Sequence, residues 1–379
     1  MNSVLKSNIF SISNFVKNNS YNFKKDQILK SLPDEYIEEA VKTICSWETY
    51  KPTPLVELDK LSNHLNIDKI YYKDEGFRFH LKSFKALGGA YAVEDISKGK
   101  KNIVISSATA GNHGRSVAWG AQRLGLDCRI FVSQYVSETR VKEIEKFGAT
   151  VTKVKGDYES SLNECIRQTK KNKWHIVQDV SNKNYKYVPQ LTMAGYSIMI
   201  KEISKQTNQY ITHVFLQAGV GGMAAGSVAG IARYFKRIPK IIVVEPKEAA
   251  CVLKSIEAKK MKKIKIKKES IMGGMSCNEM SLVPWNILNK STNHCITIDD
   301  SKVSNTVAML AKAKFSNKKI IGGECATPGI ISLIAACNDK KIKNLLELNE
   351  KSNVLVMGCE GNADATLYNK LLSQGLKKI

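Results

Sequence analysis

The chain has 379 residues with a hydrophobic content of 43%, so it can form one large or two medium domains and is not intrinsically disordered. Its formal net charge is +23, but the lysines are scattered, and no helix-turn-helix, zinc-finger or RNA-recognition pattern accompanies them. No run of 18 apolar residues exists, so no transmembrane helix is expected, and nine cysteines without a CxxC pair argue against a zinc site or a disulfide framework.

The N-terminal segment, residues 1–25, is basic, rich in Ser and Asn, and free of acidic residues. That composition resembles an organelle transit peptide, although the segment contains no arginine. We favour the alternative, a mobile N-terminal extension of a cytoplasmic enzyme. The scattered cysteines are also consistent with a reducing compartment.

Short apolar, β-branched runs alternate with amphipathic stretches along the rest of the chain. The predicted strands are Asn102–Ser106, Cys128–Val132, Thr150–Val154, Ile176–Asp179, His213–Gln217, Lys240–Glu245 and Asn353–Gly358. The predicted helices include Ser116–Leu124, Ser137–Phe147, Glu159–Lys170 and Leu191–Ser204. This alternation predicts an α/β fold with mostly parallel, twisted sheets that are flanked by helices.

The sequence contains no internal repeat and no low-complexity linker. We expect boundaries near Leu87 and Tyr196. Residues 1–87 and 196–379 would then form a large domain, and residues 88–195 a smaller inserted α/β domain. Both domains would have their own mostly parallel sheet.

A lysine in a partly apolar setting occurs at Ser83-Phe84-Lys85. Phe84 and Leu87 would desolvate Lys85, and burial lowers the pKa of a lysine. Such a lysine suits a Schiff base and later a general base. The alternative is an ordinary surface lysine whose aliphatic part packs on its neighbours.

The segment Ser107–Arg115 follows a predicted strand and opens a helix. Its glycines and backbone amides would bind a carboxylate at the start of that helix. Asn112 is placed to hydrogen-bond a phenolic oxygen. We interpret His113 as a residue of the site's wall rather than a proton shuttle.

A glycine-rich loop, Gln217–Met223, lies between an apolar strand and a helix of small residues. Glycines let backbone N–H groups approach an anion, and the helix N-terminus adds a favourable dipole, so the loop suits a phosphate. It is neither a Walker loop nor a full GxGxxG motif. A tight strand-to-helix turn without a ligand is the alternative.

The densest basic run is Lys259–Lys268. It contains no Trp, Tyr or Phe, so it offers no surface on which bases could stack. We expect a solvated loop or an exposed hairpin there. Further along, a glycine-containing segment, Gly358–Gly361, follows the last predicted strand. We expect it to lie beside the glycine-containing segments Ser107–Arg115 and Gln217–Met223 at one shared site.

In combination, these motifs resemble the fold type II pyridoxal-phosphate enzymes, and the resemblance extends from Thr53 to Asn362. Within that superfamily the chain is most similar to the diaminopropionate ammonia-lyases. The motifs that carry the likeness are Lys73–Glu75, Arg78-Phe79, Phe84–Gly89, Gly111–Arg115 with Val117–Trp119, Val177–Asp179, Gln217–Gly221, Val244–Pro246 and Gly323-Glu324.

The resemblance implies a set of site residues. Lys85 matches the Schiff-base lysine, and Asp179 matches a carboxylate near the side-chain amine of the substrate; a helix cap is the alternative for Asp179. Cys359 stands beside the pyridine nitrogen, where a neutral thiol would leave that nitrogen unprotonated. The other implied cofactor contacts are Asn112, Gly219, Val220, Gly221 and Gly222. The implied substrate contacts are Thr109, Ala110, Gly111, His113 and Gly114.

The implied activity is the α,β-elimination of 2,3-diaminopropionate to pyruvate and ammonia with pyridoxal 5'-phosphate as cofactor, and the family suggests a homodimer. The lyases carry an aspartate, proposed to serve the D-substrate, where this chain has Ala110. We therefore expect a preference for the L-isomer, with Lys85 as the base. The resemblance also makes Cys251 and Cys277 a candidate pair.

Two alternatives remain. A dehydratase that acts on serine, threonine or hydroxyaspartate would share the same chemistry; Ala110 favours it, whereas Asp179 and the branch-specific motifs oppose it. A degenerate scaffold that binds nucleic acid or a protein partner would fit the basic charge. The intact Lys85, Asn112 and glycine-rich loop argue against that second alternative.

Overall fold

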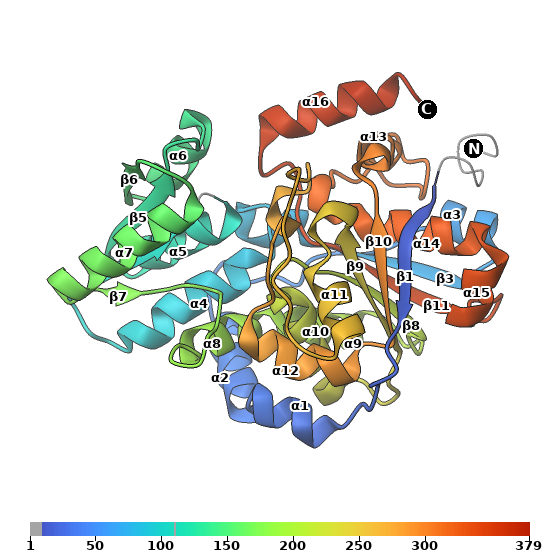
Figure 1. The fold of residues 1–379 in the computed structure, drawn as a ribbon, viewed down its shortest axis with the longest axis horizontal. Helices are drawn as coiled ribbons and strands as arrows, with labels where there is room; N and C mark the ends of the chain where they lie inside the picture. The colour runs from blue at the N-terminus through green and yellow to red at the C-terminus, as the bar shows by residue number, and fades with distance from the viewer. Residues whose placement is uncertain (1–9, 110) are drawn as a thin grey trace.

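The computed structural model describes residues 10–109 and 111–379, which form two β-sheets covered by helices (Figure 1). The strands are β1 (Ile12–Lys17), β2 (Leu55–Glu57), β3 (Lys69–Asp74), β4 (Val104–Ala108), β5 (Asp127–Ser133), β6 (Thr150–Val154), β7 (His175–Ile176), β8 (His213–Gln217), β9 (Lys240–Pro246), β10 (His294–Ile298) and β11 (Asn353–Gly358).

Sixteen α-helices lie within the described residues. They are α1 (Lys25–Ser31), α2 (Asp34–Cys45), α3 (Asp59–Leu65), α4 (Lys85–Ser97), α5 (Asn112–Arg123), α6 (Glu138–Glu145), α7 (Tyr158–Asn172), α8 (Tyr187–Tyr196), α9 (Ile198–Gln206), α10 (Gly222–Tyr234), α11 (Cys251–Ala258), α12 (Leu282–Ser291), α13 (Val303–Ala311), α14 (Pro328–Asn338), α15 (Lys340–Leu346) and α16 (Ala365–Leu376).

The larger sheet has seven strands in the order β1-β10-β9-β8-β11-β3-β2. Its five central strands are parallel, and the edge strands β1 and β2 pair antiparallel to their neighbours. Helix α10 lies between β8 and β9 in the chain, and α11 lies between β9 and β10, so the chain moves across the sheet toward β10. Helices α13 and α14 lie in the connection that returns from β10 to β11, on the other side of β8. Because parallel crossovers are right-handed, this reversal places α14 on the face opposite α10.

The smaller sheet has four parallel strands in the order β6-β5-β4-β7. All four come from residues 104–176, and all seven strands of the larger sheet come from outside that range. In Figure 1 the smaller sheet lies at the left, and α4 and α8 run between it and the larger sheet. The predicted α/β class with parallel sheets is confirmed.

Helix α4 packs against both α5 and α8, and glycines make this close packing feasible. A Cβ on Gly88 would lie 2.5 Å from Cε1 of Tyr196, and a Cβ on Gly89 would overlap the hydroxyl of Ser116. From the other side, a Cβ on Gly195 would overlap the carbonyl of Leu87. The doubled glycine after Lys85 is therefore explained by helix packing.

The predicted elements agree with the structure where the sequence pattern is apolar. The ranges of β6, β8 and β11 match the prediction, whereas the predicted strand Ile176–Asp179 is wrong in extent because only His175–Ile176 pairs with β4. The predicted helix Leu191–Ser204 is two helices, because Ser197 interrupts it and its hydroxyl donates to Ala194 O at 2.6 Å.

The expected mobile N-terminal extension is wrong from Ile12 onward, and residues 1–9 lie outside the described part of the chain. Strand β1 pairs with β10, with Ile12 opposite Ile298. The side chain of Asn18, which is 3% exposed, donates to the carbonyls of Asn289 and Thr292. The polar composition of this segment does not indicate a strand, because the partner strand β10 is far away in the sequence.

The basic run Lys259–Lys268 is a loop after α11 with every lysine exposed, so the hairpin alternative is wrong. All nine cysteines are free, and Cys251 and Cys277 form no disulfide. Within the described residues no helix has both the length and the apolar character to cross a membrane.

Candidate active site

The carboxyl ends of four strands bring the predicted site residues together. Strands β8 and β11 are parallel neighbours at the point where the chain reverses its direction across the larger sheet, and ligands gather at such a switch point. The loop Gly219–Gly222 follows β8, and Cys359 follows β11. In the smaller sheet, β4 leads to Asn112 and its neighbour β7 leads to Asp179.

Lys85 is the first residue of α4, and its ammonium group forms an ion pair with Asp179. Both side chains are largely enclosed, with exposures of 24% for Lys85 and 17% for Asp179. The rings of Phe84 and Tyr196 have their centroids 5.6 Å and 5.9 Å from Lys85 Nζ. The carbonyl of Lys85 accepts the hydroxyl of Ser116 at 2.7 Å, which fixes the start of α4 against α5.

The predicted lowering of the Lys85 pKa is wrong. Burial does oppose the charged ammonium, but the carboxylate of Asp179 outweighs burial, so the pKa of Lys85 is raised. Burial likewise opposes ionisation of Asp179, yet the paired ammonium of Lys85 lowers the pKa of Asp179. Lys85 and Asp179 are therefore both charged at neutral pH.

His113 is buried behind Asp179, with Nδ1 3.9 Å from the Asp179 carboxylate. Its Nε2 lies 3.2 Å from Val177 O, which fixes a proton on Nε2. Nδ1 has no hydrogen-bond partner among the described residues, and burial lowers the pKa of the ring. A neutral, fixed imidazole of this kind suits the wall of a site rather than proton transfer.

The predicted carboxylate-binding segment lies at the N-terminus of α5, where Gly111 is the N-cap and Asn112 the first helical residue. No atom within 4 Å would obstruct a Cβ on Gly111, so the backbone there faces open space. Gly114 packs tightly against Thr109, whose carbonyl would lie 2.7 Å from an added Cβ. The predicted substrate contact Ala110 lies outside the described residues.

The glycine-rich loop between β8 and α10 requires glycine at Gly219 and Gly221. Gly221 has φ +96°, a left-handed conformation that favours glycine. A Cβ on Gly219 would lie 2.9 Å from Cys277 Sγ and from Gly274 O. Gly222 opens α10, so the positive end of that helix dipole faces the loop.

The thiol of Cys359 is buried and donates to Cys325 O at 3.1 Å. Burial, followed by the nearby Glu360, raises the pKa of this thiol, so it is neutral. Gln217 at the end of β8 donates to the same carbonyl at 2.9 Å. The ends of β8 and β11 are thereby joined through one acceptor.

Three residues of the site were missed or given no role by the sequence analysis. Tyr196 was treated only as a domain boundary, although its ring borders Lys85. Cys277 was considered only as a disulfide partner, but it contacts the glycine-rich loop, and Cys251 donates to Gly219 O at 3.5 Å from the other side. Glu360 was part of a quoted motif, where its charge beside Cys359 was the available signal.

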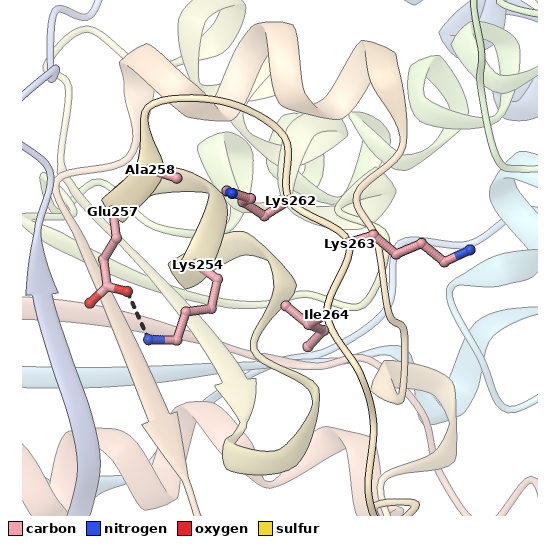
Figure 2. Close-up of a pocket in the computed structure, with 6 residues that line it drawn as sticks. All are labelled: Lys254, Glu257, Ala258, Lys262, Lys263 and Ile264. Atoms are coloured by element: carbon pink, nitrogen blue, oxygen red, sulfur yellow. Dashed lines mark hydrogen bonds and ion pairs between the residues drawn. The ribbon is translucent and has the colours of Figure 1, made fainter.

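A cavity of about 380 Å³ lies elsewhere, between the end of α11 and the basic loop (Figure 2). Lys254 and Lys263 project from it in different directions, and Glu257 pairs with Lys254 at 2.8 Å. The pairing neutralises part of the basic charge. Part of the basic run Lys259–Lys268 lines this cavity, but none of the predicted catalytic, cofactor-binding or substrate-binding residues does.

The residues present fit the cofactor that the resemblance implies. In the loop Gly219–Gly222, a Cβ added to Gly219 or to Gly221 would lie 2.9 Å from a neighbouring atom, and the loop ends at a helix N-terminus suited to phosphate. The hydroxyl of Tyr196 is buried without a hydrogen-bond partner among the described residues, and it borders Lys85. An enclosed lysine beside such a loop suits an aldehyde that carries a phosphate.

Comparisons with known proteins agree with this geometry. Residues 47–360 match the model of the family described as pyridoxal-phosphate dependent enzyme. The diaminopropionate ammonia-lyase of Escherichia coli K12 is 31% identical over 351 residues, which cover 86% of this chain and 88% of that protein. The Salmonella typhimurium enzyme of the same name is 31% identical over 360 residues, covering 86% of this chain and 89% of that protein.

Solved structures of the E. coli enzyme are also similar. Its complex with an aminoacrylate-PLP azomethine reaction intermediate has a TM-score of 0.88 at 30% identity, covering 97% of this chain and 98% of that one. Its complex with D-serine has the same TM-score at 29% identity, with the same coverage of both chains. A tomato threonine deaminase with a TM-score of 0.79 is 17% identical over 96% of this chain and 97% of that one, and shares the fold.

Proposed function

The chain belongs to the pyridoxal-phosphate-dependent enzyme family and is related over most of its length to diaminopropionate ammonia-lyases, and from that premise we propose that it eliminates ammonia from L-2,3-diaminopropionate. The products would be pyruvate and two molecules of ammonia. The single observation that carries the proposal is the ion pair between Lys85 and Asp179. It places a base and a carboxylate within one enclosed site.

Lys85 and the loop Gly219–Gly222 would hold the two ends of the cofactor, Asn112 would face its phenolic oxygen, and Cys359 would lie beside its ring nitrogen. Bound pyridoxal phosphate supplies an electron-withdrawing ring that disperses the charge left at the α-carbon. The backbone amides of the segment 109–114, at the N-terminus of α5, would bind the substrate carboxylate.

Lys85 Nζ would remove the α-proton of the substrate. Asp179 would bind and orient the β-ammonium, which is the leaving group, because the same carboxylate already binds the ammonium of Lys85. His113 would form the buried wall behind that carboxylate. Tyr196 and Phe84 would shield the site from water on the side of their rings.

The preference for the L-isomer follows from the presence of one base for the α-proton. The sequence has Ala110 where the lyases carry an aspartate, so Lys85 would be the base for the α-proton. A base on one face of the substrate serves one configuration at the α-carbon. The same alanine also favours the second candidate function, a dehydratase of serine, threonine or hydroxyaspartate.

Pyruvate or oxoacid release from a substrate panel tests the proposal and separates it from the dehydratase. The panel contains both isomers of diaminopropionate, together with L-serine, L-threonine and hydroxyaspartate. We expect the highest kcat/KM for L-diaminopropionate and at least a tenfold lower value for the D-isomer. A higher kcat/KM for any of the hydroxy amino acids would assign the chain to the dehydratase instead.

We further propose that the protein works in the cytoplasm as a homodimer, with residues 1–87 and 196–379 as the cofactor-binding domain and residues 88–195 as an inserted domain. The nine free cysteines support a reducing compartment. Light scattering of the purified holoenzyme tests the dimer, for which the expected mass is twice the 42.2 kDa of one chain. A mass of one chain would refute the dimer.

A further inference from the structure

Glu360 joins the loops of the two sheets through its carboxylate. One oxygen accepts a hydrogen bond from Asn112 Nδ2 at 2.7 Å, and the other accepts the backbone N–H of Cys325 at 3.0 Å. The residue is 6% exposed. A buried carboxylate is costly unless donors satisfy it, so these two donors account for its presence here.

The position of Glu360 is fixed by its backbone as well. Its carbonyl accepts the N–H of Gly323 at 3.0 Å, and it forms an isolated β-bridge with Ser83, two residues before Lys85. A Cβ on Gly323 would lie 3.1 Å from Cγ of Glu360, so the side chain is closely packed. The carboxylate therefore has little freedom to turn away from Asn112.

A second carboxyl group, that of Glu324, decides where the negative charge resides. Atoms of Glu324, Cys325 and Glu360 lie within 4.8 Å of one another. Burial, followed by the proximity of Glu360, raises the pKa of Glu324 to about 8. Burial raises the pKa of Glu360 as well, but the N–H donors of Cys325 and Asn112 oppose that rise. Because Glu360 accepts these two donors, the charge of the coupled pair belongs on Glu360 and the proton on Glu324.

We propose that Glu360 is a positioning residue that fixes the amide of Asn112 toward the cofactor. The inference rests on the proposed function, because it takes Asn112 as a cofactor contact. A carboxylate can only accept hydrogen bonds, so it holds the NH2 end of the Asn112 amide and excludes the flipped orientation. One hydrogen of Nδ2 goes to Glu360, which leaves the second for the phenolic oxygen of the cofactor.

A double-mutant cycle on the holoenzyme and its cofactor-depleted form tests this role. Glu360→Gln keeps the side-chain volume but offers one acceptor oxygen to two donors, so the Asn112 amide loses its fixed orientation. The measured quantities are the Kd for pyridoxal phosphate and the Tm of Glu360→Gln, Asn112→Ala and the double variant. We expect each single change to raise the Kd about three- to tenfold, the value of one hydrogen bond.

In the double variant, the Kd should equal that of Asn112→Ala alone, because Glu360 acts through Asn112. A Kd that rises by the product of the two single effects would overturn the proposal, and so would an unchanged Kd in Glu360→Gln. Glu324→Gln is the matched control from the same carboxyl pair. Its Kd should stay within about twofold, since a protonated carboxyl and an amide are similar in shape and donor capacity.

Exchange of the carboxyl and amide groups between Glu360 and Asn112 distinguishes a positioning role of Glu360 from a purely stabilising one. In Glu360→Gln/Asn112→Asp, the new amide donates to the new carboxylate and restores the link between the loops. The Tm should recover toward that of the wild type, but the Kd should stay high, because the carboxylate introduced at position 112 has no N–H to donate to the cofactor. Recovery of both quantities would overturn the proposal.

These outcomes also separate the positioning role from the proposed function. A wild-type protein that binds no pyridoxal phosphate, or releases no pyruvate from diaminopropionate, contradicts the proposed function. A wild type that does both, combined with additive effects of Glu360→Gln and Asn112→Ala, contradicts only the positioning role.

Discussion

Lys85 at the start of α4 and Asp179 beyond β7 form an ion pair that joins the loops of the two sheets. The pair keeps the lysine protonated, because Asp179 outweighs the effect of burial on the pKa of Lys85. A protonated amine cannot attack an aldehyde, so the lysine must lose a proton before it can bind the cofactor covalently. Once Lys85 is bonded, Asp179 is left to receive the ammonium of a substrate.

Replacement of Asp179 should separate its substrate role from a structural one. Asp179→Asn should lower kcat/KM for L-diaminopropionate about 10- to 100-fold, the value of a hydrogen bond to a charged group. With β-chloroalanine, whose leaving chloride carries no ammonium, the loss should be less than about threefold. Equal losses with both substrates, measured by pyruvate release, would show that Asp179 only supports the fold.

The same variant should change the pH dependence of cofactor capture. In the wild type, Asp179 raises the pKa of Lys85, so capture of pyridoxal phosphate by the apoprotein should accelerate as pH rises. Asp179→Asn removes the largest influence that raises the pKa of Lys85, while burial still lowers it, so the profile should move to lower pH. Stopped-flow absorbance between pH 6 and pH 10 measures this, and an unmoved profile would contradict the pairing.

Gly89, the second of the two adjacent glycines in α4, should be required for stability. Gly89→Ala forces a Cβ into the hydroxyl of Ser116, and overpacking of this kind costs about 1–3 kcal/mol. Gly273→Ala is the control, because no atom within 4 Å would meet its Cβ. Urea unfolding should show the loss in the first variant alone, and equal midpoints would contradict the packing argument.

The raised pKa of Glu324 should make stability depend on pH. Between about pH 4.5, where the unfolded group titrates, and about pH 8, the folded state holds a proton that the unfolded state releases. Stability from this group therefore falls as pH rises through that window. Glu324→Gln should remove the fall and raise the Tm at pH 8, relative to pH 5, by about 2–4 °C.

Thermal scans at the two pH values compare Glu324→Gln with the wild type. A difference in Tm between pH 5 and pH 8 that is the same in both proteins would show that Glu324 is not the group that titrates. Arg140, which pairs with Asp364 at 3.2 Å, favours ionisation of Glu324 and so opposes the rise in its pKa.

The sequence was sufficient for the parts of the fold that are apolar and local. Strands β6, β8 and β11 were predicted correctly, as were the helices α7 and α10 that follow β6 and β8. Strand β3 was missed because it ends in Lys73 and Asp74, charges that resemble a surface segment. Lys73 is 0% exposed, and Glu202, 129 positions away in sequence, satisfies it by forming an ion pair.

For the site, the sequence supplied residue types but not their partners. Lys85 and Asp179 are separated by 94 positions, so no local pattern could show that they pair and raise the pKa of the lysine. Glu360 had a visible charge beside Cys359, but its contact with Asn112 spans 248 positions. Ala110 informed the expected stereochemistry through the sequence alone.

The most direct test of the central claim is the absorbance and turnover of purified Lys85→Ala beside the wild type. The wild type should carry the visible absorbance of bound pyridoxal phosphate and release pyruvate from L-diaminopropionate. Lys85→Ala should lose the covalent cofactor absorbance and all detectable turnover, with a Tm close to that of the wild type. A Lys85→Ala protein that retains full turnover would contradict the account.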